Sequence, residues 1–306
     1  MQIAKKKHRI KRYWMLYFMM TPGLIYLMIN NYIPMLGLFI AFKNVNYTKG
    51  IFASAWIGLK NFEFLFSTTD AWIITRNTIL YNLTFIVVNL FFAVSIAILL
   101  NELKNRYAAR LYQSIILFPY LISLIVTSYL VYAILSIDTG LLNNVVTRLG
   151  GNKVMWYYEA KYWPIILVAV NTWKQAGYLC IVYYAAIIGI DRELFEAAEI
   201  DGAGRFQKIT NITLPSIRPV VTLLTLLQIG RIFFSEFGLF YYVPMDSGSL
   251  YSVTNVIDTY VYRGLMVHGN IGMASAAGLY QSVIGFLFIM LSNLIVRKID
   301  PENALY

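Results

Sequence analysis

Two basic side chains stand inside long apolar stretches, where a cation could bind an anionic solute. Lys174 interrupts the stretch from Tyr162 to Ile190, and Arg231 interrupts the stretch from Pro219 to Met245. A charged group at the centre of a bilayer costs at least ~2.5 to 3.5 kcal/mol unless it faces the protein interior or a wet cavity. At about 1.5 Å per helical residue, Lys174 lies about 17 Å beyond Trp163 and Arg231 about 18 Å beyond Pro219, so we expect both near one depth.

Two cations at one depth could form a constriction that attracts an acidic solute, through bidentate contacts from Arg and a point charge from Lys. A second interpretation needs no solute. In it, Lys174 serves helix packing, and Arg231 pairs with Glu236, which follows one to two turns later. The residues alone leave both interpretations open.

Catalytic or metal chemistry is not indicated. The single cysteine, Cys180, excludes an intramolecular disulfide and a cysteine-based metal site, and the only histidines are His8 and His268. The chain contains no HExxH, GxSxG or GxxxxGK[ST] segment. We therefore expect no catalytic residue, metal or cofactor in this chain, and any use of ATP would require a separate ATPase.

The elements that position these residues are predicted to be membrane-spanning helices. The chain of 306 residues is 59% hydrophobic and 13% charged, whereas a soluble domain is about half apolar and a quarter charged. A span needs about 20 apolar residues. Six stretches qualify: Tyr13 to Phe42, Asn77 to Asn101, Leu111 to Ile137, Tyr162 to Ile190, Pro219 to Met245 and Gly264 to Val296. We predict an all-α membrane protein with six transmembrane helices over residues 13–296.

The positive charge of the chain is explained by topology. Of its 25 Lys and Arg, fifteen fall on the side of the N-terminus, eight on the other side and two within spans. Because Lys and Arg in short loops accumulate in the cytoplasm, this places both termini there, as basic tails of residues 1–12 and 297–306. The formal charge of +10 thus does not indicate a nucleic-acid partner.

The first stretch also resembles a secretory signal, because it follows a basic start. It is much longer than the apolar core of a signal and contains Asn30, Asn31 and Pro34. We therefore expect an uncleaved first span.

Three segments on the outer side are rich in aromatic residues and turn formers. They are Lys43 to Arg76, Ser136 to Lys161 and about Asp246 to Met273. They could form a platform for an external partner. The tryptophans and tyrosines in and beside these segments, among them Trp156 and Trp163, are also explained by an interfacial aromatic belt.

The longest cytoplasmic loop, residues 191–218, is predicted to form two short helices. Asp191 can cap the first, from Arg192 to Ile200. Gly202 and Gly204 then break the helix, and a second helix from Arg205 to about Asn211 is expected to stop at Leu214 and Pro215, before Pro219 starts the next span. A short amphipathic helix of this kind suits docking into a groove of a partner.

The loop resembles a known motif. Glu196-Ala197-Ala198-Glu199-Ile200-Asp201-Gly202-Ala203, followed by Ile212-Thr213-Leu214-Pro215, is similar to the EAA motif in the membrane subunits of bacterial ABC importers. The resemblance implies the type I importer permease fold, with the loop acting as the coupling helix that seats in the ATP-hydrolysing subunit. The residues implied in coupling are Glu196, Ala197, Ala198, Asp201, Gly202, Ala203, Ile212, Leu214 and Pro215. Ile209 departs from the aromatic residue that many sugar permeases carry there.

Other segments are similar to carbohydrate permeases. Trp173, Lys174 and Gly177 match a Trp-Lys-x-x-Gly segment, and residues 255–265 and 274–280 resemble the branch for complex oligosaccharides, of the lipoprotein-associated polysaccharide permease type. The outer loop at Val243 to Asp246 lacks the Gly-Gly-Pro of many simpler sugar permeases. The resemblance therefore favours oligosaccharides over a monosaccharide or maltose-type substrate. If Lys174 and Arg231 form a cationic constriction, an acidic, uronate-containing oligosaccharide would suit it.

The resemblance also implies the partners and the mechanism. They are a second, distinct permease subunit, two cytoplasmic subunits that bind ATP and Mg, and an extracytoplasmic solute-binding protein, at the bacterial plasma membrane. The bundle would alternate between inward-open and outward-open states. From their types and positions in the spans, and not from the resemblance, the residues that could either contact sugar or hold helices together are Asn171, Lys174, Gln175, Tyr178, Gln228, Arg231 and Tyr241. The alternatives are a permease for a neutral sugar or another small solute and a stand-alone secondary transporter, although the only carboxylate predicted within a span is Glu236.

Overall fold

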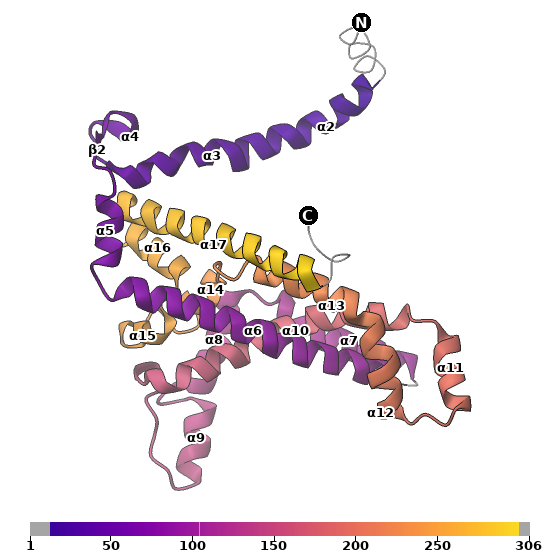
Figure 1. Ribbon diagram of the computed structural model, residues 1–306. Coiled ribbons are helices and arrows are strands. Elements are labelled where there is room, and N and C mark those ends of the chain that lie inside the picture. The colour runs from indigo at the N-terminus through magenta and orange to yellow at the C-terminus, as the bar shows by residue number, and fades with distance from the viewer. Residues whose placement is uncertain (1–12, 104, 300–306) are drawn as a thin grey trace, which may run out of the picture.

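The computed structural model describes residues 13–103 and 105–299, and most of these residues are helical (Figure 1). Five helical stretches among these residues are long and apolar enough to cross a bilayer: Trp14–Phe42, Asp70–Asn101, Ala160–Ile188, Arg205–Ile229 and Ile271–Lys298. A sixth crossing is made by two helices that meet at an angle of 98°, Tyr107–Leu121 and Leu124–Leu135. The prediction for residues 1–12 and for most of 297–306 falls outside the described residues.

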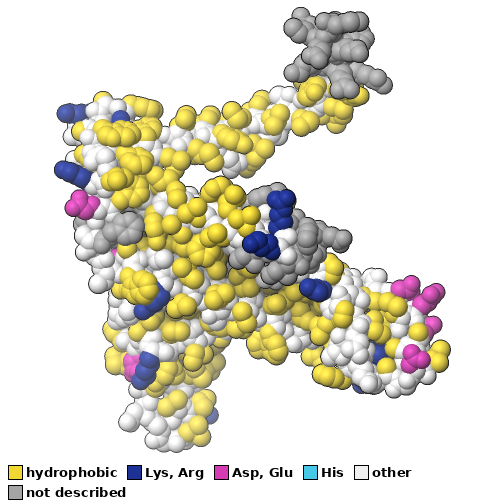
Figure 2. Space-filling view, in the orientation of Figure 1, with side chains coloured by type: hydrophobic (Ala, Val, Ile, Leu, Met, Phe, Trp, Pro, Cys, Tyr) yellow, Lys and Arg dark blue, Asp and Glu magenta, His cyan; other side chains and the backbone are white. Residues whose placement is uncertain are grey.

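The six crossings alternate in direction along the chain, so that α2 begins and α17 (Ile271–Ile299) ends toward the side where α11 projects (Figure 1). Figure 2 shows a largely apolar surface along these helices, with acidic side chains gathered at the tip that carries α11. This is the surface expected of a helix bundle that is surrounded by lipid.

The first crossing stands apart from the others in Figures 1 and 2. It consists of α2 (Trp14–Leu27), the π-helical turn Met28–Tyr32, α3 (Ile33–Met35) and the 3₁₀ helix Leu36–Phe42. None of the residues of α2 is buried, and the crossing packs on α17 through its last turns. Its large apolar side chains are therefore exposed over most of their length.

The centre of the bundle is the pair α6 (Asp70–Asn101) and α10 (Trp163–Ile188). The two helices share a core that includes Tyr81, Phe85, Trp163 and Leu167. A polar contact is buried between them, in which the Asn89 side-chain amide donates to Asn171 Oδ1 at 2.8 Å. Such amide pairs hold helices together in a medium that offers no water.

The prediction of one continuous third span from Leu111 to Ile137 was wrong. The chain forms α7 (Arg106–Leu121) and α8 (Leu124–Leu135), with extended backbone at Ile122 and Ser123 between them. Ser123 caps α8, because its hydroxyl accepts a hydrogen bond from Val126 N at 3.3 Å. Pro119 lies inside α7 close to the break, and these two residue types favour the end of one helix and the start of another.

The fifth crossing begins earlier than predicted and also ends earlier. α12 (Arg205–Lys208), the π-helical turn Ile209–Thr213 and α13 (Leu214–Ile229) form one continuous stretch, so Leu214 and Pro215 do not stop the helix and Pro219 does not start one. Pro215 lies in the first turn of α13, directly after the π-helical turn. A widened turn accommodates the clash between a proline ring and the carbonyl of the preceding turn. Arg231 consequently lies after the helix, in the connection to α14 (Phe237–Tyr241).

The outer loops form a connected layer at the end of the bundle opposite α11. Its elements are β1 (Lys43–Asn44), α4 (Gly50–Ala53), β2 (Ala55–Trp56), α5 (Lys60–Phe66), α9 (Leu141–Arg148), the 3₁₀ turns Trp156–Tyr158, Ala160–Tyr162 and Gly248–Leu250, α15 (Tyr251–Thr254) and α16 (Ile257–Met266). β1 and β2 pair antiparallel, with Lys43 opposite Trp56. Tyr47 OH donates to Gly269 O at 3.1 Å, and Ser247 Oγ to Tyr157 O at 3.0 Å, so the three loops are joined. Trp163 is fully buried rather than exposed in an aromatic belt.

α7 and α10 approach each other closely at Gly177. A Cβ atom added there would lie 1.9 Å from Ile116 O, whereas one added at Gly278 on α17 would meet nothing within 4 Å. We expect Gly177→Ala to separate α7 from α10 and to destabilise the protein by about 1–3 kcal/mol. Thermal unfolding in detergent tests this, with Gly278→Ala as the matched control, which should keep or raise the melting temperature. Equal melting temperatures for the two variants would contradict the close approach.

Candidate functional sites

The loop between α10 and α12 projects from the body of the molecule as a separate helix, α11 (Arg192–Ile200) (Figure 1). Its bounds are those predicted from the sequence. The Asp191 carboxylate caps it by accepting a hydrogen bond from Glu193 N at 3.1 Å, which satisfies one of the free amides of the first turn. None of its residues is buried by the described chain.

The end of α11 explains the second half of the Glu-Ala-Ala segment. Gly202 has a φ of +77°, Ala203 N donates to Ala198 O at 2.8 Å, and Gly202 N donates to Glu199 O at 3.1 Å. These two bonds, around a residue in the left-handed region, are the Schellman arrangement that ends many helices. The glycine of the Asp-Gly-Ala sequence is thus a structural requirement, because a residue with a Cβ atom is strained at position 202.

An ion pair joins α11 to the next helix. Lys208 Nζ lies 2.6 Å from Glu199 Oε1, and this ammonium group holds the pKa of the Glu199 carboxyl below its ordinary value. Gly204 N also donates to Gln207 Oε1 at 2.7 Å. α11 is therefore linked to the fifth crossing, which continues from α12 into α13.

A cleft of about 1110 Å³ lies behind α11, among the ends of α6, α7, α10 and α12. Glu196, Phe195 and Glu199 line it from α11. Other apolar side chains are exposed on this loop, with Ile200 88% and Phe206 77% exposed. The motif did not single out Phe206, although an aromatic residue in a cytoplasmic loop was a signal that could have found it.

The second half of the motif is half-buried at the start of α13. Ile212 is partly buried, while Leu214 and Pro215 are exposed. Thr213, between them, is buried. The predicted coupling residues of the first half therefore lie on α11 and directly after it. Those of the second half lie in the π-helical turn Ile209–Thr213 and at the start of α13.

Three of the predicted pathway residues line one cavity of about 260 Å³. Asn171, Lys174 and Gln175 contribute from α10, facing Tyr120, Ile122 and Leu124 at the α7–α8 break and Glu236 and Leu239 near α14. Tyr120 and Glu236 were not among the predicted pathway residues. Glu236 was visible as the one carboxylate predicted within a span, whereas nothing in the sequence distinguished Tyr120 from other tyrosines.

Lys174 is 7% exposed, and its ammonium group donates hydrogen bonds to backbone carbonyls at the break between α7 and α8. Nζ donates to Pro119 O at 3.0 Å and to Ile122 O. Pro119 O also accepts a hydrogen bond from Ile122 N at 3.3 Å, whereas Ile122 O has no other donor among the described residues, and an unsatisfied polar group within the membrane is costly. Gly177, one turn further along α10, allows α7 to lie near enough for these bonds. Lys174 and Gly177 therefore both support the packing of α10 against α7.

The other pathway candidates lie elsewhere. Tyr178 stacks on Tyr120 with ring centroids 4.8 Å apart. Arg231 is exposed in the turn after α13, and the structure, which describes both residues, shows no ion pair between it and Glu236. The backbone carbonyl of Gln228 accepts a hydrogen bond from Arg231 N at 3.0 Å. The ring of Tyr241 stacks on that of Phe237, with centroids 5.0 Å apart. Lys174 and Arg231 therefore do not line one cavity together.

Comparison with known proteins identifies a family. The sequence profile of the binding-protein-dependent transport system inner membrane component matches residues 71–301. The polygalacturonan/rhamnogalacturonan transport system permease protein YteP of Bacillus subtilis (strain 168) is 33% identical over 291 residues, which are 94% of this chain and 89% of that protein. Protein LplB of the same organism is 33% identical over 298 residues, covering 96% and 92% of the two chains.

Solved structures are also similar. One is a bacterial ABC transporter involved in the import of the acidic polysaccharide alginate, with a TM-score of 0.88, 31% identity, and coverage of 97% of this chain and 99% of the other. A second is the bacterial alginate transporter in complex with an alginate pentasaccharide-bound periplasmic protein, with a TM-score of 0.86, 31% identity and coverage of 95% and 97%.

Replacing Lys174 tests whether it supports the break or binds a solute. Lys174→Met leaves Ile122 O without a donor, at a cost of about 1–3 kcal/mol for the unsatisfied group, so we expect a lower melting temperature in detergent together with weaker uptake. Gln175→Met is the matched control, because Gln175 lines the same cavity and should affect uptake alone. A Lys174→Met variant with an unchanged melting temperature and a raised KM would instead assign the cation to the solute.

Proposed function

The chain belongs to the family of binding-protein-dependent transport system inner membrane components, and we propose from this premise that it is a permease subunit of an ABC importer for oligosaccharides. The family and the type I permease fold agree with the resemblance that the sequence carries. The third crossing is broken between α7 and α8, and the fifth begins and ends earlier in the sequence than predicted. The chain still has six crossings when α7 and α8 count as one.

The substrate class that we propose is acidic, uronate-containing oligosaccharides. Two similar proteins are named for polygalacturonan/rhamnogalacturonan and for the acidic polysaccharide alginate. In this chain, the stacked pair Tyr120 and Tyr178 offers aromatic surface beside the cavity, and Arg231 offers an exposed guanidinium group. Guanidinium groups bind carboxylates in a bidentate manner.

The observation that carries the proposed mechanism is the exposed state of α11. α11 has no fully buried residue in the described chain and exposes Ile200, and the adjoining α12 exposes Phe206. An exposed apolar helix of this kind is suited to insert into a groove of another protein. We assign that groove to a cytoplasmic ATP-binding subunit, of which the importer has two, each binding ATP and Mg. Closure of these subunits would move α11 and change the bundle between inward-open and outward-open states.

The detached first crossing supports a second permease subunit. No residue of α2 is buried by the described chain, and Asn30 and Asn31 lie in the middle of the crossing. Polar side chains on a membrane helix normally face protein rather than lipid. We infer that this crossing packs on a homologous but distinct permease chain.

The connected outer loops fit the remaining partner, an extracytoplasmic solute-binding protein. The similar alginate transporter has been solved with its periplasmic protein. We infer that α11 and both ends of the chain lie in the cytoplasm of a bacterium, which the excess of Lys and Arg in the loops on that side supports. A neutral oligosaccharide, or another small solute, is the alternative substrate for the same assembly.

A charge on α11 should uncouple the permease from its ATPase. We expect Ile200→Asp to leave folding intact, because the side chain is 88% exposed, and to reduce both co-purification of the ATP-binding subunits and uptake at least tenfold. The matched control is Phe52→Asp, which changes a side chain that is 86% exposed at the opposite end and should keep the ATP-binding subunits. Uptake that persists after removal of those subunits would instead identify a stand-alone secondary transporter.

Arg231 provides the test of the substrate class. Loss of one charge-assisted contact costs about 1.5–3 kcal/mol, so Arg231→Ala should reduce kcat/KM for an acidic oligosaccharide about 10- to 100-fold. Uptake of a neutral oligosaccharide of equal length should change little, and Arg231→Lys should recover part of the loss. Unchanged transport of the acidic oligosaccharide would remove the proposed role of this cation, while leaving the permease function in place.

A further inference from the structure

α9 has an apolar face that the described chain leaves uncovered. Leu149, directly after the helix, is 82% exposed, and Leu141, Leu142 and Val145 are exposed as well. At 100° per residue these four side chains fall within about one third of the helix circumference. The opposite side carries Asn143, which is buried at 1% exposure, so the helix is amphipathic.

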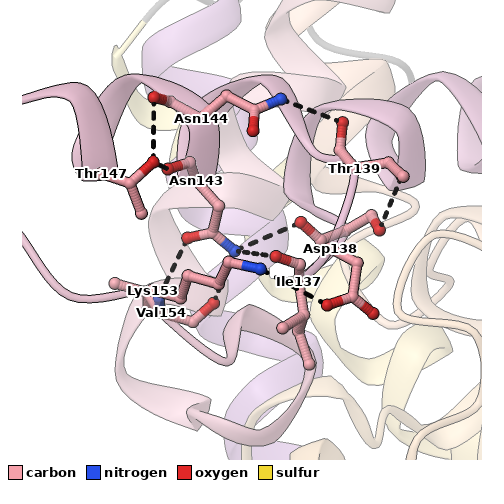
Figure 3. Close-up of polar contacts among 9 residues, drawn as sticks. Ile137, Asp138, Thr139, Asn143, Asn144, Thr147, Lys153 and Val154 are labelled. Carbon is pink, nitrogen blue, oxygen red and sulfur yellow. Dashed lines mark hydrogen bonds and ion pairs between the residues drawn. The ribbon is translucent and has the colours of Figure 1, made fainter.

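Hydrogen bonds and an ion pair hold together the segments before and after α9 (Figure 3). The Asn143 amide nitrogen donates to Ser136 O at 3.2 Å and to Val154 O at 3.0 Å, while Asn143 Oδ1 accepts from Val154 N at 2.9 Å. One side chain therefore binds the chain both before and after α9. Lys153 and Asp138 add an ion pair of 3.5 Å between the same two segments. The apolar face is thus held in a fixed orientation.

Two further hydrogen bonds fix the level of α9 relative to the membrane spans. Trp156 Nε1 donates to Asn143 Oδ1 at 3.2 Å, and Trp163 Nε1 donates to Trp156 O at 2.7 Å. Trp163 is the first residue of α10. α9 therefore lies at the boundary where a span begins, at the end of the bundle opposite α11.

The direction of α9 differs from that of the spans. Figure 1 shows that α9 runs across the direction of α6 and α17 and extends beyond the side of the bundle. A helix in this position lies parallel to the plane of the bilayer, above the lipid that surrounds the spans. It follows α8 after the five residues from Ser136 to Gly140, and α8 also exposes large apolar side chains, among them Ile125, Val126 and Tyr129.

We propose that α9 is an interfacial helix that inserts Leu141, Val145 and Leu149 into the outer leaflet of the bilayer. Amphipathic helices lie in this plane with their apolar face among the upper acyl chains and their basic side chains toward the headgroups. Arg148 and Lys153 are the basic side chains at this position. The occupant of the apolar face is a phospholipid surface, and the outer loop that meets the solute-binding protein is thereby anchored to the membrane.

Site-directed spin labelling of the assembled transporter in nanodiscs tests this inference. Cys180 is the only cysteine of the chain, so Cys180→Ala provides the background for single labels at Leu149→Cys, Val145→Cys and, on the polar side, Asn144→Cys. Collisions with oxygen report lipid, and collisions with a water-soluble nickel complex report water. We expect the labels at positions 145 and 149 to meet oxygen readily and to meet nickel at least fivefold less often than the label at position 144.

Three other outcomes would overturn the proposal. Equal nickel accessibility at all three positions would show that the face is exposed to water. Protection of positions 145 and 149 from both reagents in the assembled transporter would assign the face to the second permease subunit. Protection that appears only after the solute-binding protein is added would assign it to that protein. None of these outcomes depends on which oligosaccharide is transported.

Discussion

The architecture depends on how backbone carbonyl groups find hydrogen-bond donors where a membrane helix is broken. The third crossing turns by 98° between α7 and α8, and Lys174 donates to two carbonyls at this break. In lipid such carbonyls have no water to bind. The bonds require α10 to lie against α7, which Gly177 permits, and α10 in turn forms the main contact with α6. One ammonium group thus supports a bend that gives the cavity of about 260 Å³ one of its walls.

A second chain of contacts leads from α11 to that cavity. The Glu199–Lys208 ion pair joins α11 to α12, and α12 continues without a break through α13 to the turn after Ile229. That turn is held from three other elements, since Asn82 donates to Ile232 O at 2.8 Å, Gln281 donates to Phe233 O at 2.6 Å and the Asp258 carboxylate accepts from Ser235 N at 2.8 Å. In the proposed mechanism, movement of α11 would reach Arg231 and Glu236 as displacement of a continuous helix.

Local sequence rules predicted the parts of the fold that local forces determine. The capped start of α11 at Asp191 and its end at Gly202 follow from hydrogen bonds within a few residues, so its bounds were predicted correctly. The break at Ser123 and the early end of α13 were missed, because the absence of charge shows only that a segment lies in the membrane and not that it is one helix. The contacts of Lys174 likewise could not be predicted, because its position along a helix gives its depth in the membrane but does not identify the residues that its side chain contacts.

The placement of charge changes where selectivity for an acidic substrate can arise. Two cations at one depth would attract carboxylates into the cavity, but Lys174 is bound to carbonyls and the Glu236 carboxylate lines the same cavity. The cavity wall therefore carries one positive and one negative charge, and it offers an anion little net attraction at long range. Arg231 is outside this pair and exposed. Recognition of an acidic chain would then rest on Arg231, on the second permease subunit and on the solute-binding protein, with this cavity recognising sugar rings through its aromatic and amide side chains.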